Sequence, residues 1–183
     1  MAQVDNRITP KKLAAGAGVL IAAAFCVNLI LSPTGATQLD ASSMRSVTAE
    51  GTFKTVQGDG SRAIHVFLST DCTFCRQIDP ELGRLENVIV YRHLLPGHTD
   101  AGRRAALDVW CSDTPSTAWK NVAAGSHTVS KSCDGAALHK NLELARRLGL
   151  TTTPAIVYAN GNVSAGLLST AEMSDRIVRA TTR

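Results

Sequence analysis

The chain has 183 residues, of which 44% are hydrophobic and 4% aromatic, and its formal net charge is +4. This length is enough for one domain of ordinary size and an additional segment, with an aliphatic core. The positive charge is scattered along the sequence and no stripe of aromatic residues accompanies it, so the composition argues against nucleic-acid binding.

The N-terminal segment has the pattern of a membrane anchor. Residues 1–12 are polar and end in Lys11-Lys12, and residues 13–31 carry no charge. A helix of this length rises roughly 28 Å, close to the thickness of the hydrocarbon core of a bilayer. The lysines before it predict a cytoplasmic N-terminus, a transmembrane signal anchor over 13–31 and export of the rest. A cleaved signal peptide is the alternative, because Thr34-Gly35-Ala36 resembles a small-residue cleavage site.

Residues 32–50 contain Pro, Gly, Ser and Thr without a sustained period, which predicts an exposed linker to a domain over 51–183. Two strands are then predicted, at 52–56 and 63–68, with a Gly-Asp-Gly turn between them. Together they predict a hairpin. His65 lies in the second strand and is interpreted as a surface or core histidine rather than a catalytic base.

Two cysteines, Cys72 and Cys75, follow this second strand directly. The residues after them are spaced for a helix, and Asp71 is the expected N-cap, with Thr70 as a substitute. A thiol at a helix N-terminus is biased toward thiolate, and a second thiol one turn later can attack a mixed disulfide formed at the first. The negative charge of Asp71 is expected to oppose thiolate formation in part.

A CxxC pair also occurs in zinc sites and in structural disulfides. Zinc would need two further ligands close in sequence, and Cys111 and Cys133 are 22 positions apart, which does not give that pattern. The position after a strand and at a helix start favours a redox-active dithiol. We therefore expect no metal and no cofactor. Cys26, within the predicted anchor, is given no role.

The rest of the chain alternates between predicted helices and strands. Pro80 predicts a kink in the helix after the CxxC pair, and residues 88–95 predict a strand. Residues from about 98 to 150 are helical in character and predict an inserted helical subdomain. Asn160-Gly161 predicts a type I′ hairpin turn between strands at 156–158 and 163–167. Ser169 and Glu172 predict a capping box at the start of a final helix.

The CxxC pair after a strand, the proline five residues beyond Cys75 and the later Thr153-Pro154 resemble the thioredoxin superfamily. The resemblance is sharper to the catalytic domain of the bacterial periplasmic disulfide isomerases DsbC and DsbG. It rests on Val109-Trp110-Cys111-Ser112-Asp113, on Cys133-Asp134 and on residues 148–157.

The resemblance implies an α/β thioredoxin-like fold with an inserted helical subdomain. It implies that Cys72 is the exposed nucleophile and Cys75 the buried resolving thiol. It implies a cis Pro154, with the backbone of Thr153 presenting an edge to a substrate peptide. The dipeptide Thr73-Phe74, which is Gly-Tyr in DsbC, would also contact substrate.

From the sequence alone, Cys111 and Cys133 either pair as a structural disulfide or form a second redox pair. The resemblance implies the structural disulfide. The chain departs from DsbC in one large respect. Residues 32–62 are too few for the separate N-terminal dimerisation domain of that family, and a predicted membrane segment stands in its place.

Two functional hypotheses follow. The first is a single-pass inner-membrane protein with its catalytic domain in the periplasm, a thiol–disulfide oxidoreductase of the isomerase or reductase type. Its partners would be disulfide-containing exported proteins and a membrane redox partner that reduces or reoxidises the CxxC pair. The second is a non-catalytic, membrane-tethered adaptor or chaperone with a thioredoxin fold in a cell-envelope or secretion assembly. The intact cysteine pair favours the first.

Overall fold

The computed structural model describes residues 38–127, 129 and 131–182. The predicted anchor at 13–31 and the polar segment before it lie outside these residues. Within the described part of the chain, no helix is both long and apolar enough to cross a bilayer.

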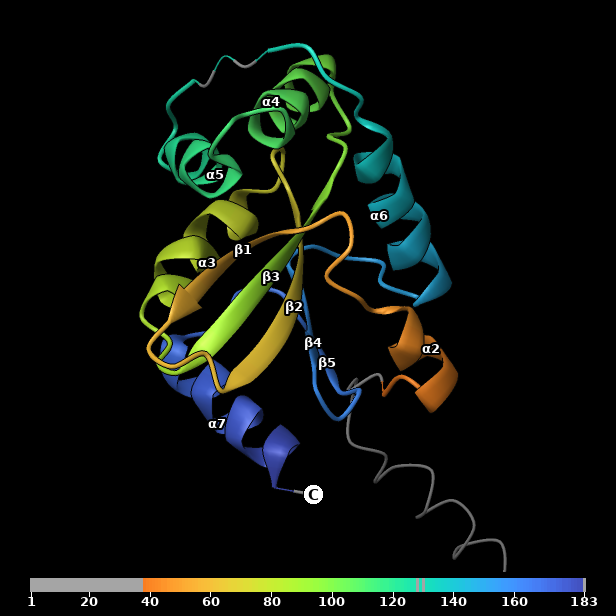
Figure 1. Ribbon diagram of the computed structural model, residues 1–183, viewed down its shortest axis with the longest axis vertical. Coiled ribbons are helices and arrows are strands. Elements are labelled where there is room, and N and C mark those ends of the chain that lie inside the picture. Colours follow the sequence, from red (N-terminus) through yellow and green to blue (C-terminus); the bar gives the residue numbers. More distant parts are fainter. Residues whose placement is uncertain (1–37, 128, 130, 183) are drawn as a thin grey trace, which may run out of the picture. The chain divides into compact units, whose positions relative to one another are not determined.

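The described residues form a mixed α/β domain (Figure 1). Its strands are β1 (Phe53–Gln57), β2 (Arg62–Ser69), β3 (Val88–Leu95), β4 (Ala155–Tyr158) and β5 (Val163–Ala165). Its helices are α2 (Ala41–Ser46), α3 (Thr73–Gly83), α4 (Asp100–Trp110), α5 (Pro115–Ala123), α6 (Ala136–Arg147) and α7 (Thr170–Thr181). Most strands and helices lie close to the ranges predicted from the sequence, and α3 continues through Pro80.

The strands form a single sheet in the order β1-β3-β2-β4-β5. β2 pairs in parallel with β3 along its whole length, through the crossover helix α3, and antiparallel with β4. The predicted hairpin between β1 and β2 is therefore wrong. Both edges of β2 are occupied by β3 and β4, so β1 pairs antiparallel with the outer edge of β3.

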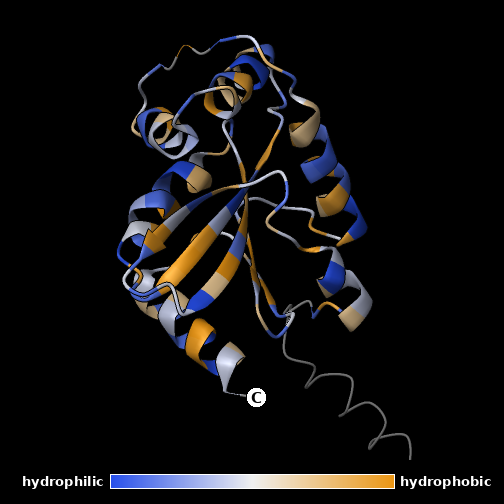
Figure 2. Cartoon of the chain, in the orientation of Figure 1, coloured by the Kyte–Doolittle hydropathy of each residue, from blue (hydrophilic) through white to orange (hydrophobic). Residues whose placement is uncertain are grey.

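Helices cover both faces of the sheet (Figures 1 and 2). On one face the apolar side chains of β2 and β3 pack against α3, α5 and α7, and the largest group of buried residues lies there. On the other face Phe67 and Val157 pack against Leu144 of α6 and Leu148, the residue that ends this helix. The continuous apolar runs of β2 and β3 suit strands covered on both sides.

The helical region predicted at 98–150 divides into two parts. α6 lies against β3 and covers the sheet as a layer of the α/β fold. α4 and α5 pack against each other, and α5 also packs against α3. The added helical structure thus consists of α4, α5 and the connection to α6, beside the end of β2 where the CxxC pair lies (Figure 1).

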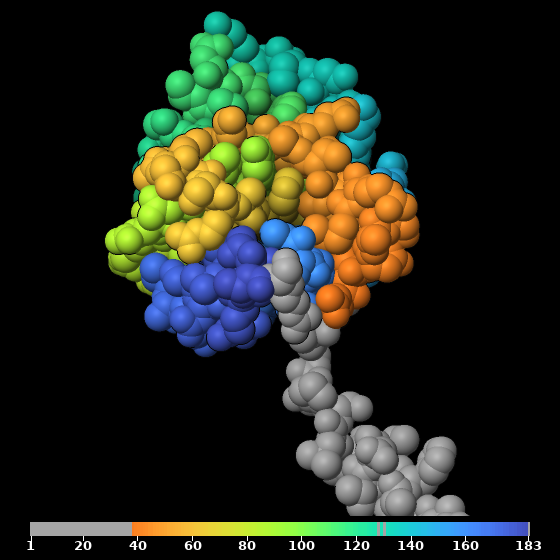
Figure 3. Space-filling model, turned by 60° about the horizontal axis from the view of Figure 1, so that its bottom comes forward, coloured from red at the N-terminus to blue at the C-terminus, as the bar shows by residue number. Residues whose placement is uncertain are grey.

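Residues 38–50, predicted to be an exposed linker, contain no buried residue, but they include the short helix α2 and contact the domain. Asp40 caps α2 by accepting a hydrogen bond from the Ser43 N–H, and Leu39 and Met44 pack against the core beneath α6. The Leu39 N–H also donates to the Gly161 carbonyl at 2.8 Å. In Figure 3 the orange surface of this segment adjoins the rest of the domain. These apolar side chains hold the segment on the domain. The sequence did not predict this contact because most residues of the segment are polar.

The turn between β4 and β5 also differs from the prediction. A type I′ turn requires positive φ at both Asn160 and Gly161. Gly161 has φ of 84°, whereas among the described non-glycine residues only Asn87 has positive φ. The Gly161 N–H donates to the Tyr158 carbonyl at 2.9 Å, so the connection is a type I turn closed by a left-handed glycine. β5 consequently begins at Val163, and it ends at Ala165, before residue 167.

Two buried polar networks interrupt the core. On the α3 face, Asp79 Oδ1 accepts hydrogen bonds from Arg92 Nη2 at 2.9 Å and from Trp119 Nε1 at 2.8 Å. On the α6 face, His65 Nδ1 lies 2.9 Å from His93 Nε2, and His93 Nδ1 lies 3.3 Å from Asn141 Oδ1. Each network joins the sheet to the helical layer above it.

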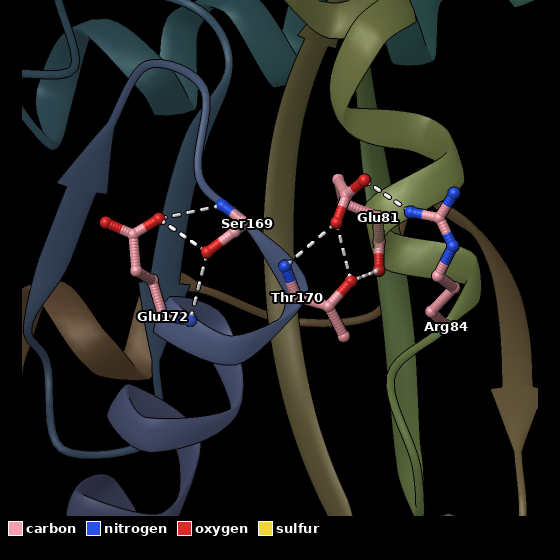
Figure 4. Close-up of polar contacts among 5 residues, drawn as sticks. All are labelled: Glu81, Arg84, Ser169, Thr170 and Glu172. Carbon is pink, nitrogen blue, oxygen red and sulfur yellow. Dashed lines mark hydrogen bonds and ion pairs between the residues drawn. The ribbon is translucent and has the colours of Figure 1, made fainter.

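A third polar cluster joins α3 to α7 (Figure 4). Ser169 and Glu172 form the predicted capping box at the start of α7. Glu81 Oε2 accepts hydrogen bonds from the Thr170 N–H at 3.0 Å and the Thr170 hydroxyl at 2.7 Å, and Glu81 also pairs with Arg84. These bonds, the Thr170 hydroxyl first, lower the pKa of Glu81 to about 2.

Replacing Glu81 with Gln is expected to lower the melting temperature by about 2–4 °C, because the N-terminus of α7 loses a charged acceptor. The pKa of Glu81 is depressed, so its stabilisation is present above pH 4.5 and is lost as the pH falls toward 2. Thermal melts of the wild type and E81Q should therefore converge over that range. Glu143→Gln, at an exposed position on α6, serves as the control. Its melting temperature should follow that of the wild type over the same pH range.

Candidate active site

Cys72 stands where β2 passes into α3. Its N–H donates to the Ser69 carbonyl in a tight turn, and its extended backbone makes it the N-cap of α3. The Cys72 sulfur accepts a hydrogen bond from the Cys75 N–H at 3.1 Å. The sequence-based prediction that Asp71 caps this helix is therefore wrong, because the sulfur itself occupies the capping position.

Asp71 instead bonds to the loop before α4. Its carboxylate accepts hydrogen bonds from the backbone N–H groups of His98 and Thr99 and from the Thr99 hydroxyl. Burial raises the pKa of Asp71, but the bonds from Thr99 and His98 together outweigh it and hold this pKa below its ordinary value. Asp71, the residue before Cys72, is thus ionised, and hydrogen-bond donors near the start of α4 bind its carboxylate.

The two cysteines are joined as a disulfide, with their Cα atoms 5.2 Å apart. Cys72 is partly exposed, whereas Cys75 has no exposed surface and packs in the main core. In the reduced state the N–H donors at the start of α3 would stabilise a thiolate at Cys72. The geometry suits Cys72 for attack on an external disulfide and Cys75 for attack on Cys72.

Thr153 lies directly beside Cys72, although 81 residues separate the two in sequence. The peptide bond between Thr153 and Pro154 is cis, as the resemblance implies. The Thr153 carbonyl oxygen is 3.2 Å from the Cys72 sulfur. Pro154 is buried at the start of β4, and its carbonyl accepts a hydrogen bond from the Gly166 N–H at 2.9 Å. The sheet therefore fixes this backbone next to the cysteine pair.

The surface around Cys72 has an apolar and a charged part. Thr73 and Phe74 are both exposed, with 55% of Phe74 accessible to solvent. A cleft of about 600 Å³ opens beside Asp71 and is also lined by Arg76 and Arg104. Arg76 Nη1 donates to the Thr70 carbonyl at 3.1 Å, which attaches it to the same loop.

Cys111 and Cys133 form a second disulfide, with an S–S distance of 1.96 Å and a Cα–Cα distance of 5.6 Å. Cys111 is the C-cap of α4, and Cys133 is exposed in the connection before α6. This bond attaches the end of α4 to a connection without regular secondary structure in its described residues. In the described part of the chain, no group of three or more His, Cys, Asp or Glu side chains is arranged to hold a metal ion.

The sequence reasoning did not find the contact between Asp71 and the loop before α4. The only signal was the position of Asp71 next to Cys72, which a helix-capping role already explained. It also treated His65 as a single histidine, whereas the parallel pairing of β2 and β3 brings His93 to it.

Comparison with known proteins shows that residues 49–181 match the family model of a thioredoxin-like domain. The chain belongs to this thioredoxin-like family. The match covers the five strands and the helices α3 to α7 of the described residues, together with the two disulfides found among them.

Its thioredoxin-like domain is similar to curated disulfide interchange proteins. It is 33% identical over 125 residues to the probable thiol:disulfide interchange protein DsbC of Bordetella parapertussis, covering 68% of this chain and 44% of that protein. It is 26% identical over 116 residues to DsbC of Escherichia coli K12, covering 61% of this chain and 49% of that protein. The chain spans about half the length of the curated relatives it matches.

A solved structure shows the same relationship. A disulfide interchange protein from Neisseria gonorrhoeae superimposes with a TM-score of 0.68 at 26% identity, over 75% of this chain and 100% of that one. These findings confirm the resemblance to the DsbC group inferred from the cysteine and Thr-Pro motifs.

Proposed function

We propose that this chain is a membrane-anchored, periplasm-facing thiol–disulfide oxidoreductase of the isomerase or reductase type. The observation that carries the proposal is the placement of the Cys72 sulfur at the N-terminus of α3. There it accepts the Cys75 N–H and lies 3.2 Å from the Thr153 carbonyl. The similarity to DsbC proteins supports the same activity.

In the reductive direction, the Cys72 thiolate attacks one sulfur of a substrate disulfide. A mixed disulfide forms, and the other substrate sulfur leaves as a thiolate. Cys75, after losing its proton, attacks the Cys72 sulfur and releases the second substrate thiolate. The substrate gains two electrons and the cysteine pair becomes a disulfide. In isomerisation, a substrate thiolate attacks the mixed disulfide before Cys75 does, and the protein is regenerated reduced.

The substrate segment is proposed to lie along the backbone at Thr153. That backbone precedes β4, beside the Cys72 sulfur, and an extended peptide could pair with it. Exposed Phe74 and its neighbour Thr73 would contact side chains next to the substrate cysteine. Cys111–Cys133 is proposed to be structural, since it closes a 22-residue separation and so restricts the unfolded chain, by about 3 kcal/mol in the chain-entropy model.

The direction of electron flow is assigned to an unidentified membrane redox partner. A protein working as isomerase or reductase must be kept reduced by such a partner, whereas an oxidase must be reoxidised. The apolar segment 13–31 supports placing the domain at the inner membrane, on the periplasmic side.

Replacing Cys75 with Ala should trap mixed disulfides on Cys72, because no resolving thiol remains. The variant is expressed in full-length form, free thiols are blocked at harvest, and partners are identified by mass spectrometry after reduction. We expect exported proteins with disulfides to be recovered with C75A and lost with the matched double variant C72A/C75A.

Purified protein assayed on a scrambled disulfide substrate then separates isomerase from simple reductase. If C75A traps nothing and the wild type reduces no model disulfide, the enzyme proposal fails. A Cys72→Ser strain with the wild-type phenotype, alongside a deletion strain with a defect, would indicate the adaptor role instead.

A further inference from the structure

The loop that carries Cys72 is attached to the first turn of α4. The Thr70 hydroxyl donates to the Gly102 carbonyl at 2.8 Å, and this bond is buried. Next to it, the Asp71 carboxylate accepts the Thr99 N–H at 2.9 Å and the Thr99 hydroxyl at 3.2 Å, together with the His98 N–H. Both residues immediately before the proposed nucleophile are thus bonded to the N-terminal end of α4, Thr70 within its first turn and Asp71 at its N-cap and the residue before it.

Gly102 permits this close approach. A Cβ atom built on Gly102 would lie 1.7 Å from Asp71 Oδ1, and its three nearest atoms all belong to the Asp71 carboxylate. Gly102 lies in the first turn of α4 and its φ is not in the left-handed region, so its backbone does not itself require glycine. What requires glycine at this position is the carboxylate of Asp71.

The contact also determines how the charge of Asp71 acts on Cys72. An ionised carboxylate that makes no hydrogen bonds disfavours the thiolate form of a neighbouring thiol, because both groups are negative. Here three donors and the positive end of the α4 dipole bind the carboxylate and offset its charge. Asp71 can therefore hold the loop without strongly opposing thiolate formation at Cys72.

We propose that Asp71 is a positioning residue: its bonds to Thr99, the N-cap of α4, and to His98 hold the loop so that the Cys72 sulfur stays at the N-terminus of α3. This inference rests on the proposed function in taking Cys72 as the nucleophile. The proposal gives the added helix α4 a role in the reaction. The loop that carries Cys72 keeps its position because the residues at the start of α4 bind the Asp71 carboxylate.

The test is a double-mutant cycle on the reduced full-length protein, with D71A, G102A and D71A/G102A. The readout is the rate of iodoacetamide alkylation of Cys72, mapped by mass spectrometry, as a function of pH. D71A removes the carboxylate, and G102A places a methyl group where the carboxylate lies. We expect each single variant to lower the alkylation rate at pH 7 by roughly tenfold and to shift its titration to higher pH.

The double variant distinguishes positioning from other effects. D71A removes the three atoms that lie nearest to the methyl group at position 102, so G102A should cost much less in the D71A background than in the wild type. If the charge of Asp71 were its only influence, D71A would instead speed alkylation and G102A would leave it unchanged. That outcome, or penalties that simply add, would overturn the proposal.

Asp100→Asn is the matched control, because it removes an exposed carboxylate from the same turn of α4. It should leave the alkylation profile unchanged, and thermal melts should show that all variants remain folded at the assay temperature. The readout needs no protein substrate. A protein that shows the expected cycle but exchanges no disulfides would refute the proposed function and leave the role of Asp71 standing.

Discussion

Replacing Asp79 with Ala is expected to lower the free energy of unfolding by about 3–5 kcal/mol, because the variant leaves a charged guanidinium buried without its partner. Arg92 is 2% exposed, and its ion pair with Asp79 Oδ1 measures 2.9 Å. The Trp119 indole N–H, also buried, loses its acceptor in the same variant. Urea unfolding followed by circular dichroism measures the change.

A neutral pair separates the unpaired charge from the loss of the side chain. In Asp79→Asn combined with Arg92→Met, the amide oxygen can still accept the Trp119 N–H and no buried cation remains. We expect this double variant to be more stable than D79A. The exposed Asp175→Ala on α7 controls for loss of a helical carboxylate. A cost below about 1 kcal/mol for D79A would show that Arg92 reaches water or another partner.

Acid should destabilise the protein between about pH 6.5 and pH 4 through the buried histidine pair. Burial lowers the pKa of His65 to about 4. Burial and the neighbouring His65 charge do the same for His93, against an opposing hydrogen bond that His93 donates to Asn141 Oδ1. The unfolded chain binds these protons near pH 6.5, so stability is complete above that pH and is lost as the pH falls toward 4. A shift of this size corresponds to about 3 kcal/mol for one histidine.

The hydrogen bonds show how the neutral pair is satisfied and why both rings cannot be charged together, whereas burial is the main cause of the lowered pKa values. Asn141 Nδ2 donates to the carbonyls of Gly51 and Leu94, so its Oδ1 is the acceptor that faces His93. His93 Nδ1 must then carry a proton, and its Nε2 accepts from His65 Nδ1. Each ring therefore holds one proton, and two charged rings would place two N–H groups against each other.

Urea unfolding at a series of pH values measures this effect. His65→Gln should flatten the dependence between pH 6.5 and 4.5, a range in which the carboxyl groups with lowered pKa remain ionised. His139→Gln, at an exposed position on α6, should leave the slope unchanged. Equal slopes for the wild type and H65Q would contradict the assignment to the histidine pair.

The sequence predicted where strands and helices lie better than it predicted which strands pair with each other. The short apolar runs at 63–68 and 88–95 were predicted to be strands, and both are strands. Their pairing with each other, and the exclusion of β1 from β2, depend on a crossover through α3 that a local Gly-Asp-Gly turn could not reveal. The meeting of His65 and His93 has the same origin, because it follows from the register between two strands.

The candidate site shows the same division. Cys72, Cys75 and the cis Thr153–Pro154 bond were identified from motifs, because family motifs preserve residues that meet in space. Asp71 was misplaced because the capping rule considers only the nearest helix. The donors that bind it come from the start of α4, after an intervening helix and strand. A rule that considers only neighbouring residues in the sequence cannot predict hydrogen bonds to donors so far along the chain.

The exposure of Cys133 has an energetic consequence for the proposed activity. Each of the two disulfides among the described residues includes a cysteine that is at least partly exposed to solvent, and therefore to a second copy of the protein. A reduced Cys72 on one molecule would attack the Cys111–Cys133 bond of another unless that bond were harder to reduce. A hundredfold preference corresponds to about 60 mV in reduction potential. The proposed function therefore requires the two disulfides to differ in reduction potential, with Cys111–Cys133 at a lower potential than Cys72–Cys75.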